Sequence, residues 1–250
     1  MSAFIEQTVE SLNNSGRLIY IGSGTSGRLG VLDASECPPT FGVSKNMVIG
    51  VIAGGDVALK ESVEGAEDSS MSSIKQLDEI SLNSKDIVLG ISASGTTPFV
   101  ISALKYAKKI GASTGLLTCN HVDRKRYVNH LIKVIVGPEI LSGSTRLKSG
   151  TATKMVLNMI STVTMIKLNR TFGNVMIDLL PKNKKLINRS IDIIVDQLSI
   201  DRQKAKNIYD MSGGNLKIAI LMGRNKLSQK EAGIILDENK GSLSDSLKSR

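Results

Sequence analysis

Short apolar runs rich in β-branched residues recur along the first 140 residues and alternate with longer stretches of helical periodicity. Such alternation is typical of βαβ units and predicts a parallel sheet. The expected strands are Arg17–Gly22, Met47–Gly55, Asp86–Ser94, Ser113–Asn120 and His130–Gly137. The expected helices lie near Gly27–Ala34, Ala58–Leu77 and Pro98–Ile110. The chain is therefore predicted to be an α/β protein.

After Gly150 the pattern becomes almost entirely helical. Apolar residues from Ile187 to Leu198 recur with the spacing of one face of an amphipathic helix. Ser228 and Glu231 form a capping-box pattern that predicts the start of a later helix. We therefore expect a main domain over residues 1–198 and a small helical domain over residues 199–250.

The composition is ordinary for a globular protein, with 41% hydrophobic and 22% charged residues, and the formal net charge is +9. Aromatic residues make up only 3% of the chain and are not interleaved with the basic residues, which are mostly scattered. This pattern argues against nucleic acid as a partner. A lysine-rich solvated surface and an anionic small substrate both fit the charge.

Cysteines and histidines are too few and too separated for a structural role in crosslinking or metal binding. Cys37 and Cys119 form no CxxC motif, and His121 and His130 lie near no carboxylate cluster. We therefore expect no disulfide framework and no metal. An N-terminal apolar segment is absent, and polar residues interrupt the apolar stretch Met155–Leu168, so the sequence predicts a cytoplasmic protein without a membrane partner.

The first candidate for chemistry is the loop GSGTSGR, which directly follows the first expected strand at residues 22–28. Its backbone N–H groups, its hydroxyls and the start of the next helix are suited to bind an anion. The candidate binding residues are Ser23, Gly24, Thr25 and Ser26. The loop also matches the GxGxxG pattern of dinucleotide sites, but the next strand is not followed by a clear ribose-binding acid. The hydroxyls favour a phosphomonoester over a dinucleotide.

A second loop of the same kind, SASGTTP, follows the expected strand at Asp86–Ser94. Its candidate binding residues are Ser92, Ser94, Gly95 and Thr97. Ordinary helix caps are the alternative for either loop alone. Two such loops at the carboxyl ends of parallel strands predict one shared crevice for a sugar phosphate.

Carboxylates supply the third candidate, because two carboxyl groups in different protonation states can act as acid and base. Glu36 precedes Pro38-Pro39 in what we expect to be a turn, and Glu64, Glu67 and Asp68 lie in the segment VEGAEDSS. Considered singly, each glutamate is better explained as a solvated surface carboxylate. A fourth stretch, residues 137–154, contains Arg146 and Lys148, which are suited to hold a carboxylate or phosphate.

Together these stretches resemble the N-acetylmuramic acid 6-phosphate etherases. The resemblance is carried by IGSGTSGRLGVLDASECPPTFG, VEGAEDSS, SASGTTPFVISALKYAKKIGA and GPEILSGSTRLKSGTATK, and it extends in order over nearly the whole chain. It implies a sugar isomerase (SIS) fold, a parallel sheet flanked by helices with a small C-terminal helical appendage. It also implies a homodimer, in a superfamily whose sites often lie across subunit interfaces.

The reaction implied by the resemblance is the cleavage of N-acetylmuramic acid 6-phosphate to N-acetylglucosamine 6-phosphate and D-lactate. By motif, Glu67 matches the base that removes the proton on carbon 2 of the open-chain sugar. Glu36 matches the acid that assists the departure of lactate from carbon 3, after which water adds. The implied role is the recovery of cell-wall sugars, and no cofactor is implied.

The chain departs from the family in two places. The family usually reads ASGRTPY where this chain reads ASGTTPF, so Thr96 stands in place of an arginine. The family also usually begins with a longer N-terminal arm, which leads us to expect a fragment or a short variant. The rival functions are a non-catalytic sugar-phosphate sensor of the glucokinase-regulator type and an aldose–ketose isomerase. Neither rival needs both Glu36 and Glu67.

Overall fold

A computed structural model describes residues 1–178 and 184–249. The chain forms two compact units, each described here by itself. The larger unit comprises Met1–Cys37 and Ser44–Thr164, and the smaller comprises Pro38–Val43 with the chain from Met165 onward. The sequence predicts a domain boundary at residue 198, whereas the core of the smaller unit includes residues of the helix that precedes this position.

A five-stranded parallel sheet forms the centre of the larger unit, with the strand order β2-β1-β3-β4-β5. Its strands are β1 (Leu18–Gly22), β2 (Val48–Ile52), β3 (Ile87–Ile91), β4 (Ser113–Thr118) and β5 (His130–Lys133). All five coincide with expected strands, so the predicted α/β fold is confirmed. The strand order reverses direction between β1 and β3, and ligands of such sheets usually bind at this point.

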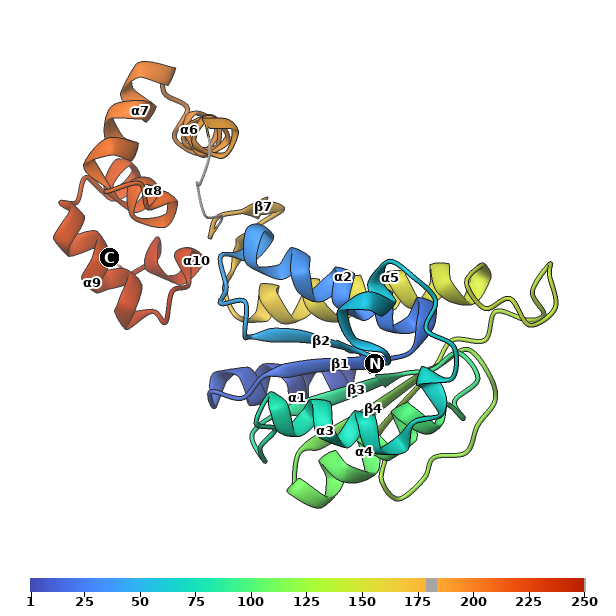
Figure 1. Ribbon diagram of the computed structural model, residues 1–250. Coiled ribbons are helices and arrows are strands. Elements are labelled where there is room, and N and C mark those ends of the chain that lie inside the picture. The colour runs from blue at the N-terminus through green and yellow to red at the C-terminus, as the bar shows by residue number, and fades with distance from the viewer. Residues whose placement is uncertain (179–183, 250) are drawn as a thin grey trace. The chain divides into compact units, whose positions relative to one another are not determined.

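Helices cover both faces of the sheet (Figure 1). Those of the larger unit are α1 (Ser2–Asn13), α2 (Gly24–Phe41), α3 (Ser70–Glu79), α4 (Pro98–Ile110) and α5 (Lys148–Lys167). Figure 1 shows α3 and α4 on one side of the sheet and α2 and α5 on the other. Leu77, Val100 and Leu104 of α3 and α4 form a buried core with strand residues such as Ile19 and Val88. The helix α4 begins at Pro98 and ends before Gly111, as its sequence predicts.

A buried ion pair connects the starts of β1 and β3. The Asp86 side chain has no exposed surface, and its Oδ2 lies 2.6 Å from an Arg17 guanidinium nitrogen. The same oxygen accepts hydrogen bonds from the backbone and side chain of Asn83, and Oδ1 accepts the backbone N–H and the Nε–H of Arg17. The carboxylate is therefore satisfied on both oxygens, as a buried charge requires.

Two details of the larger helical stretches differ from the sequence-based expectation. The turn expected at Pro38-Pro39 is instead the last part of α2, because a proline φ is compatible with a helix even though its N–H is missing. The helix expected at Ala58–Leu77 is divided into η1 (Gly55–Leu59), η2 (Ala66–Asp68) and α3. Gly65, which directly precedes η2, has a φ of 70°, a left-handed conformation that a continuous helix does not contain.

The smaller unit is mostly helical and also contains a short hairpin that the sequence pattern does not predict, β6 (Thr171–Phe172) and β7 (Val175–Met176). Its helices are α6 (Lys184–Leu198), α7 (Arg202–Met211), α8 (Leu216–Asn225), α9 (Gln229–Glu238) and α10 (Leu243–Ser246). The capping box of Ser228 and Glu231 is confirmed at the start of α9. The buried Lys217 donates to the carbonyls of Asn169 and Gly241 and to the Asp178 carboxylate.

No helix within residues 1–178 and 184–249 is long and apolar enough to cross a membrane.

Candidate functional site

The two hydroxyl-rich loops follow neighbouring strands. Gly22, the last residue of β1, pairs with Ile91, the last residue of β3, so Ser23 and Ser92 leave the sheet at the same edge. Adjacent strands lie about 4.8 Å apart. The structure thus places at one edge of the sheet the two loops that the sequence predicts to share a crevice, but no residue of 92–97 lines the cavities described below.

The first loop turns sharply into α2 and packs closely on itself. A Cβ at Gly27 would lie 2.7 Å from the carbonyl oxygen of Gly22 and 2.6 Å from Ile52, so no larger residue fits at this position. The N–H of Gly27 donates to the Ser23 carbonyl at 3.0 Å. This close packing directs the N-terminus of α2 toward the loop, an arrangement that is suited to bind an anion.

The second loop is organised around Ser92, whose side chain is buried. Its hydroxyl accepts the N–H of Gly95 at 3.0 Å and lies 2.8 Å from the hydroxyl of Thr97. Ser94 and Thr96 are exposed and joined by a 2.9 Å hydrogen bond between their hydroxyls. Because Ser94 is exposed and Thr97 is half-buried, both are better placed than the buried Ser92 to contact a ligand.

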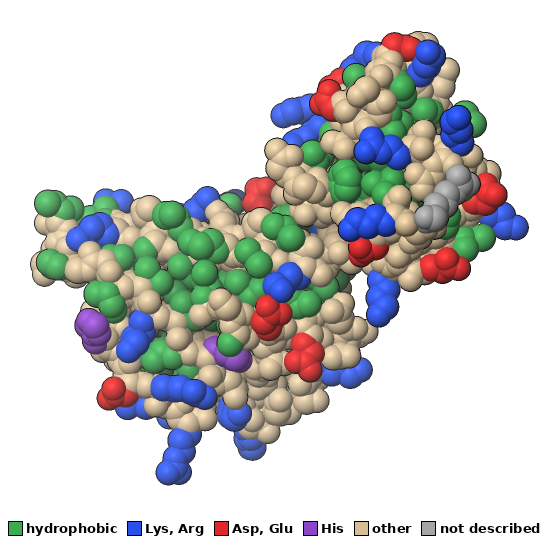
Figure 2. Space-filling model, turned by 180° about the vertical axis from the view of Figure 1, so that it is seen from behind, with side chains coloured by type: hydrophobic (Ala, Val, Ile, Leu, Met, Phe, Trp, Pro, Cys, Tyr) green, Lys and Arg blue, Asp and Glu red, His purple; other side chains and the backbone are tan. Residues whose placement is uncertain are grey.

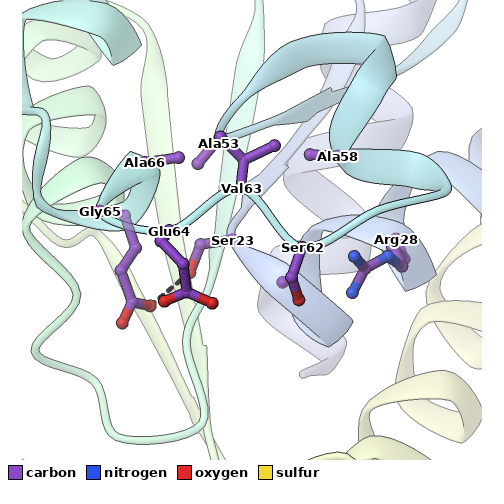
Figure 3. Close-up of a pocket in the computed structure, with 11 residues that line it drawn as sticks. Ser23, Arg28, Ala53, Ala58, Ser62, Val63, Glu64, Gly65 and Ala66 are labelled. Atoms are coloured by element: carbon purple, nitrogen blue, oxygen red, sulfur yellow. Dashed lines mark hydrogen bonds between the residues drawn. The ribbon is translucent and has the colours of Figure 1, made fainter.

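A cavity of about 190 Å³ opens beside the first loop (Figure 3). Its lining comprises Ser23, Gly24, Arg28, Ala53, Ala58 and residues 62–67. The Ser23 hydroxyl donates to the Glu67 carboxylate at 3.1 Å, the bond drawn as a dashed line in Figure 3. Glu64 presents a second carboxylate next to this bond, and Arg28 donates to the Glu61 carbonyl at 2.9 Å.

The other predicted carboxylate, Glu36, lies elsewhere. It is exposed on α2 and lines a second cavity of about 260 Å³ with Asp33, Lys154 and Asn158 among others. This cavity shares no lining residue with the cavity of Glu67. Twelve residues separate Glu36 from the start of α2 at Gly24, a rise of about 18 Å along the helix. Within one chain the two carboxylates therefore do not meet.

The other predicted residues, Thr25, Ser26 and Lys148, lie outside both of these cavities. Thr25 lines a third cavity of about 300 Å³ with Leu29, Arg146, Gly150, Thr151 and Lys154. Ser26 is half-buried in the first turn of α2 and lines none of the three described cavities. Lys148 is not free to bind an anion through its amide, because Glu139 accepts the N–H groups of Lys148 and Ser149 at 2.9 Å each.

Lys154 and Asp33 are the site residues that the sequence analysis did not single out. Lys154 lines both the second and the third cavity. Burial raises the pKa of Asp33, while hydrogen bonds from Asn158 and Ser161 oppose this shift. The i, i+3 and i+7 spacing of Thr151, Lys154 and Asn158 places them on one face of α5 and was the available signal. No group of three or more potential metal ligands occurs in the described part of the chain.

Known proteins resemble this chain over most of its length. Residues 1–108 match the family model described as the glucokinase regulatory protein N-terminal SIS domain. The N-acetylmuramic acid 6-phosphate etherase of Staphylococcus epidermidis is 52% identical over 99% of this chain and 84% of its own length. That of Clostridium botulinum strain Eklund 17B is 49% identical over 98% of this chain and 81% of its own length. The chain belongs to the N-acetylmuramic acid 6-phosphate etherase family.

Solved structures similar to this member of the etherase family are more distant. A phosphoheptose isomerase from Neisseria gonorrhoeae has 18% identity and a TM-score of 0.45, covering 64% of this chain and 82% of its own. A putative sugar-binding protein from Salmonella typhimurium has 13% identity and a TM-score of 0.46, covering 97% of this chain and 66% of its own. The fold description therefore rests on the strand order of the etherase chain itself.

Proposed function

We propose that this chain cleaves the lactyl ether of N-acetylmuramic acid 6-phosphate, giving N-acetylglucosamine 6-phosphate and D-lactate, as a cytoplasmic enzyme of cell-wall sugar recovery. The observation that carries the proposal is the hydrogen bond from Ser23 to Glu67, at a cavity beside the point where the strand order reverses. Relatives about 50% identical over nearly the full chain bear the name of this activity.

The chemistry requires a base and an acid. In the open-chain form of the sugar, the aldehyde acidifies the proton on carbon 2, and Glu67 removes it as the general base. The C–O bond at carbon 3 then breaks, and Glu36 in its acid form gives its proton to the leaving lactate. Water adds to the resulting unsaturated aldehyde at carbon 3. The phosphate is held by the second loop through Ser94, Gly95 and Thr97, which Ser92 orders, and the sugar lies along Ser23 to Ser26.

The position of Glu36 supports an active site built from two copies of the chain. The lactyl oxygen that is protonated is bonded to carbon 3, and the proton that is removed is bonded to carbon 2. Because these carbons are neighbours, the two carboxylates must face the same substrate molecule. A separation of about 18 Å along α2 does not allow this within one chain. In the proposed homodimer, Glu36 of one copy acts in the cavity that contains Glu67 of the other.

The surface around Glu36 is suited to such a contact. Leu32 on α2 and Met155 and Met159 on α5 are exposed, although they are large and apolar. Figure 2 shows hydrophobic side chains gathered across one face of the larger unit, with lysines and arginines scattered singly among them. An exposed apolar surface of this kind is typical of a protein–protein interface.

D-Lactate release in water enriched in oxygen-18 tests the proposed reaction. Incubation of the purified protein with N-acetylmuramic acid 6-phosphate should release D-lactate and place heavy oxygen on carbon 3 of the sugar. Heavy oxygen in the lactate instead would show cleavage on the lactyl side of the ether and contradict elimination. Saturable binding of the sugar phosphate without any lactate would identify a sensor of the glucokinase-regulator type.

A further inference from the structure

The cavity next to Thr25 is cationic, and the proposed reaction does not use it. Arg146 and Lys154 line it, with Leu29, Gly150 and Thr151, and none of its lining residues is a carboxylate. By contrast, the cavity of Glu67 contains two carboxylates and a single arginine. The two neighbouring cavities therefore have opposite charge.

Neither cation is held by a hydrogen bond or a salt bridge in the described part of the chain. Lys154 has an electrostatic interaction with Asp33, but its ammonium group makes no direct bond to that carboxylate. Arg28 in the neighbouring cavity is already engaged by the Glu61 carbonyl. The amides at the start of α5 are taken by Glu139, so an anion in the cationic cavity would be bound by side chains. An arginine fork and an ammonium group match a carboxylate well.

The cationic cavity also lies next to the reacting centre. Thr25 lines it, and Ser23, two residues earlier, donates to the proposed base Glu67. Two residues of chain span at most about 7 Å. A Cβ placed on Gly150 would lie 3.4 Å from the methyl group of Thr25, so the first loop and the first turn of α5 are in contact. A group attached to the carbon beside the one that Glu67 deprotonates would therefore reach this cavity.

The proposed substrate has two anionic groups, a phosphate on carbon 6 and a carboxylate on the lactyl group of carbon 3. The second loop provides hydroxyls and the N-terminus of α4 for the phosphate. We propose that Arg146 and Lys154, together with Thr25, bind the carboxylate of the lactyl group and so determine specificity for the lactyl ether. This inference rests on the proposed function, because it assigns the second anionic group of that substrate.

Binding to an inactive protein tests the subsite without depending on turnover. In a Glu67→Gln background, calorimetry should show tighter binding of N-acetylmuramic acid 6-phosphate than of N-acetylglucosamine 6-phosphate, which lacks the lactyl group. Arg146→Ala or Lys154→Met should reduce this preference about tenfold to a hundredfold, the effect of losing a charge-assisted hydrogen bond. Affinity for N-acetylglucosamine 6-phosphate should change less than about twofold, which also shows that the variants are folded.

A matched control is Lys109→Met, which removes an exposed lysine of α4 that lines none of the three cavities. It should leave both affinities unchanged. Equal binding of the two sugars by the parent protein would overturn the inference. An equal loss for both sugars in Arg146→Ala would also overturn it, because the cavity would then hold the phosphate. If the preference depends on Arg146 but the wild-type protein releases no lactate, the proposed function fails while the subsite stands.

Discussion

The side-chain amide of Asn158 on α5 donates a 2.7 Å hydrogen bond to the Asp33 carboxylate on α2. Ser161 donates to the same oxygen at 3.1 Å. The second oxygen of Asp33 is buried without a hydrogen bond of ordinary geometry, although the Tyr20 hydroxyl lies near it. The Asp33 carboxylate therefore connects α2 to α5, and Asp33 lines the same cavity as Glu36 and Lys154.

Replacing Asp33 with asparagine should remove a decrease in the free energy of unfolding that Asp33 causes as the pH rises. Burial raises the pKa of Asp33 in the folded chain above its value in the unfolded chain. Between these two values the folded protein binds more protons, so this residue lowers the free energy of unfolding as the pH rises. Asp33→Asn keeps the acceptor for Asn158 and should abolish that decrease, leaving the variant at least as stable as wild type at pH 7.

Urea unfolding at a series of pH values from 4 to 8 measures this effect. The difference in unfolding free energy between Asp33→Asn and wild type should increase in favour of the variant as the pH rises. A difference that is constant with pH would show that Asp33 has the same pKa in the folded and unfolded chain.

The buried pair of Arg17 and Asp86 predicts that replacing Asp86 greatly lowers the free energy of unfolding. Asp86→Ala removes the carboxylate that accepts from the Arg17 guanidinium and from the amide groups of Asn83, and leaves the guanidinium only the carbonyls of Ile80 and Ser81. Loss of one partner from a buried pair costs about 3–5 kcal/mol. Chemical denaturation followed by circular dichroism should show this loss. The double variant Arg17→Met with Asp86→Leu should recover part of it, and a loss below about 1 kcal/mol for Asp86→Ala would contradict the assigned role.

The sequence predicts the sheet well because each strand is a short apolar run with its own boundary signals. The position of the two loops follows from the same pattern, since Gly22 and Ile91 end neighbouring strands. The relative position of Glu36 and Glu67 does not follow, because it depends on α2 running unbroken from Gly24 past Glu36, whereas the sequence pattern predicts a helix only to about Ala34. The sequence could not predict the cationic cavity either, because Arg146 and Lys154 lie near Thr25 only when α5 packs beside α2.

Complementary variants test whether two copies build each active site. Glu36→Gln and Glu67→Gln should each lower kcat by about a hundredfold to ten-thousandfold, the usual effect of losing a general acid or base. If the site combines Glu36 of one copy with Glu67 of the other, a mixed dimer contains one intact site. An equal mixture refolded together should then recover about a quarter of wild-type activity. Lactate release measures this recovery.

The same experiment distinguishes a site shared between two copies of the chain from a site within one chain. No recovery, with mixed dimers demonstrated by tagged subunits, would show that both glutamates act within one chain or that Glu36 has another role. Each variant refolded alone is the control and should stay inactive. Both side chains are exposed, so neither replacement should change the unfolding midpoint.

Thr96 offers a test of how the second loop holds the phosphate. Its hydroxyl donates to Ser94, and no cationic residue occurs between Ser92 and Pro98. The proposed phosphate contact there consists of hydroxyls, amides and the N-terminus of α4, so an added guanidinium would supply a charge-assisted bond. Thr96→Arg should lower KM about tenfold with little change in kcat, since the phosphate takes no part in the reacting bonds. Thr96→Gln, which also replaces the hydroxyl but adds no charge, should not lower KM. If Thr96→Gln lowers KM as much as Thr96→Arg, the gain comes from loss of the Thr96–Ser94 bond, and the phosphate does not lie against this loop.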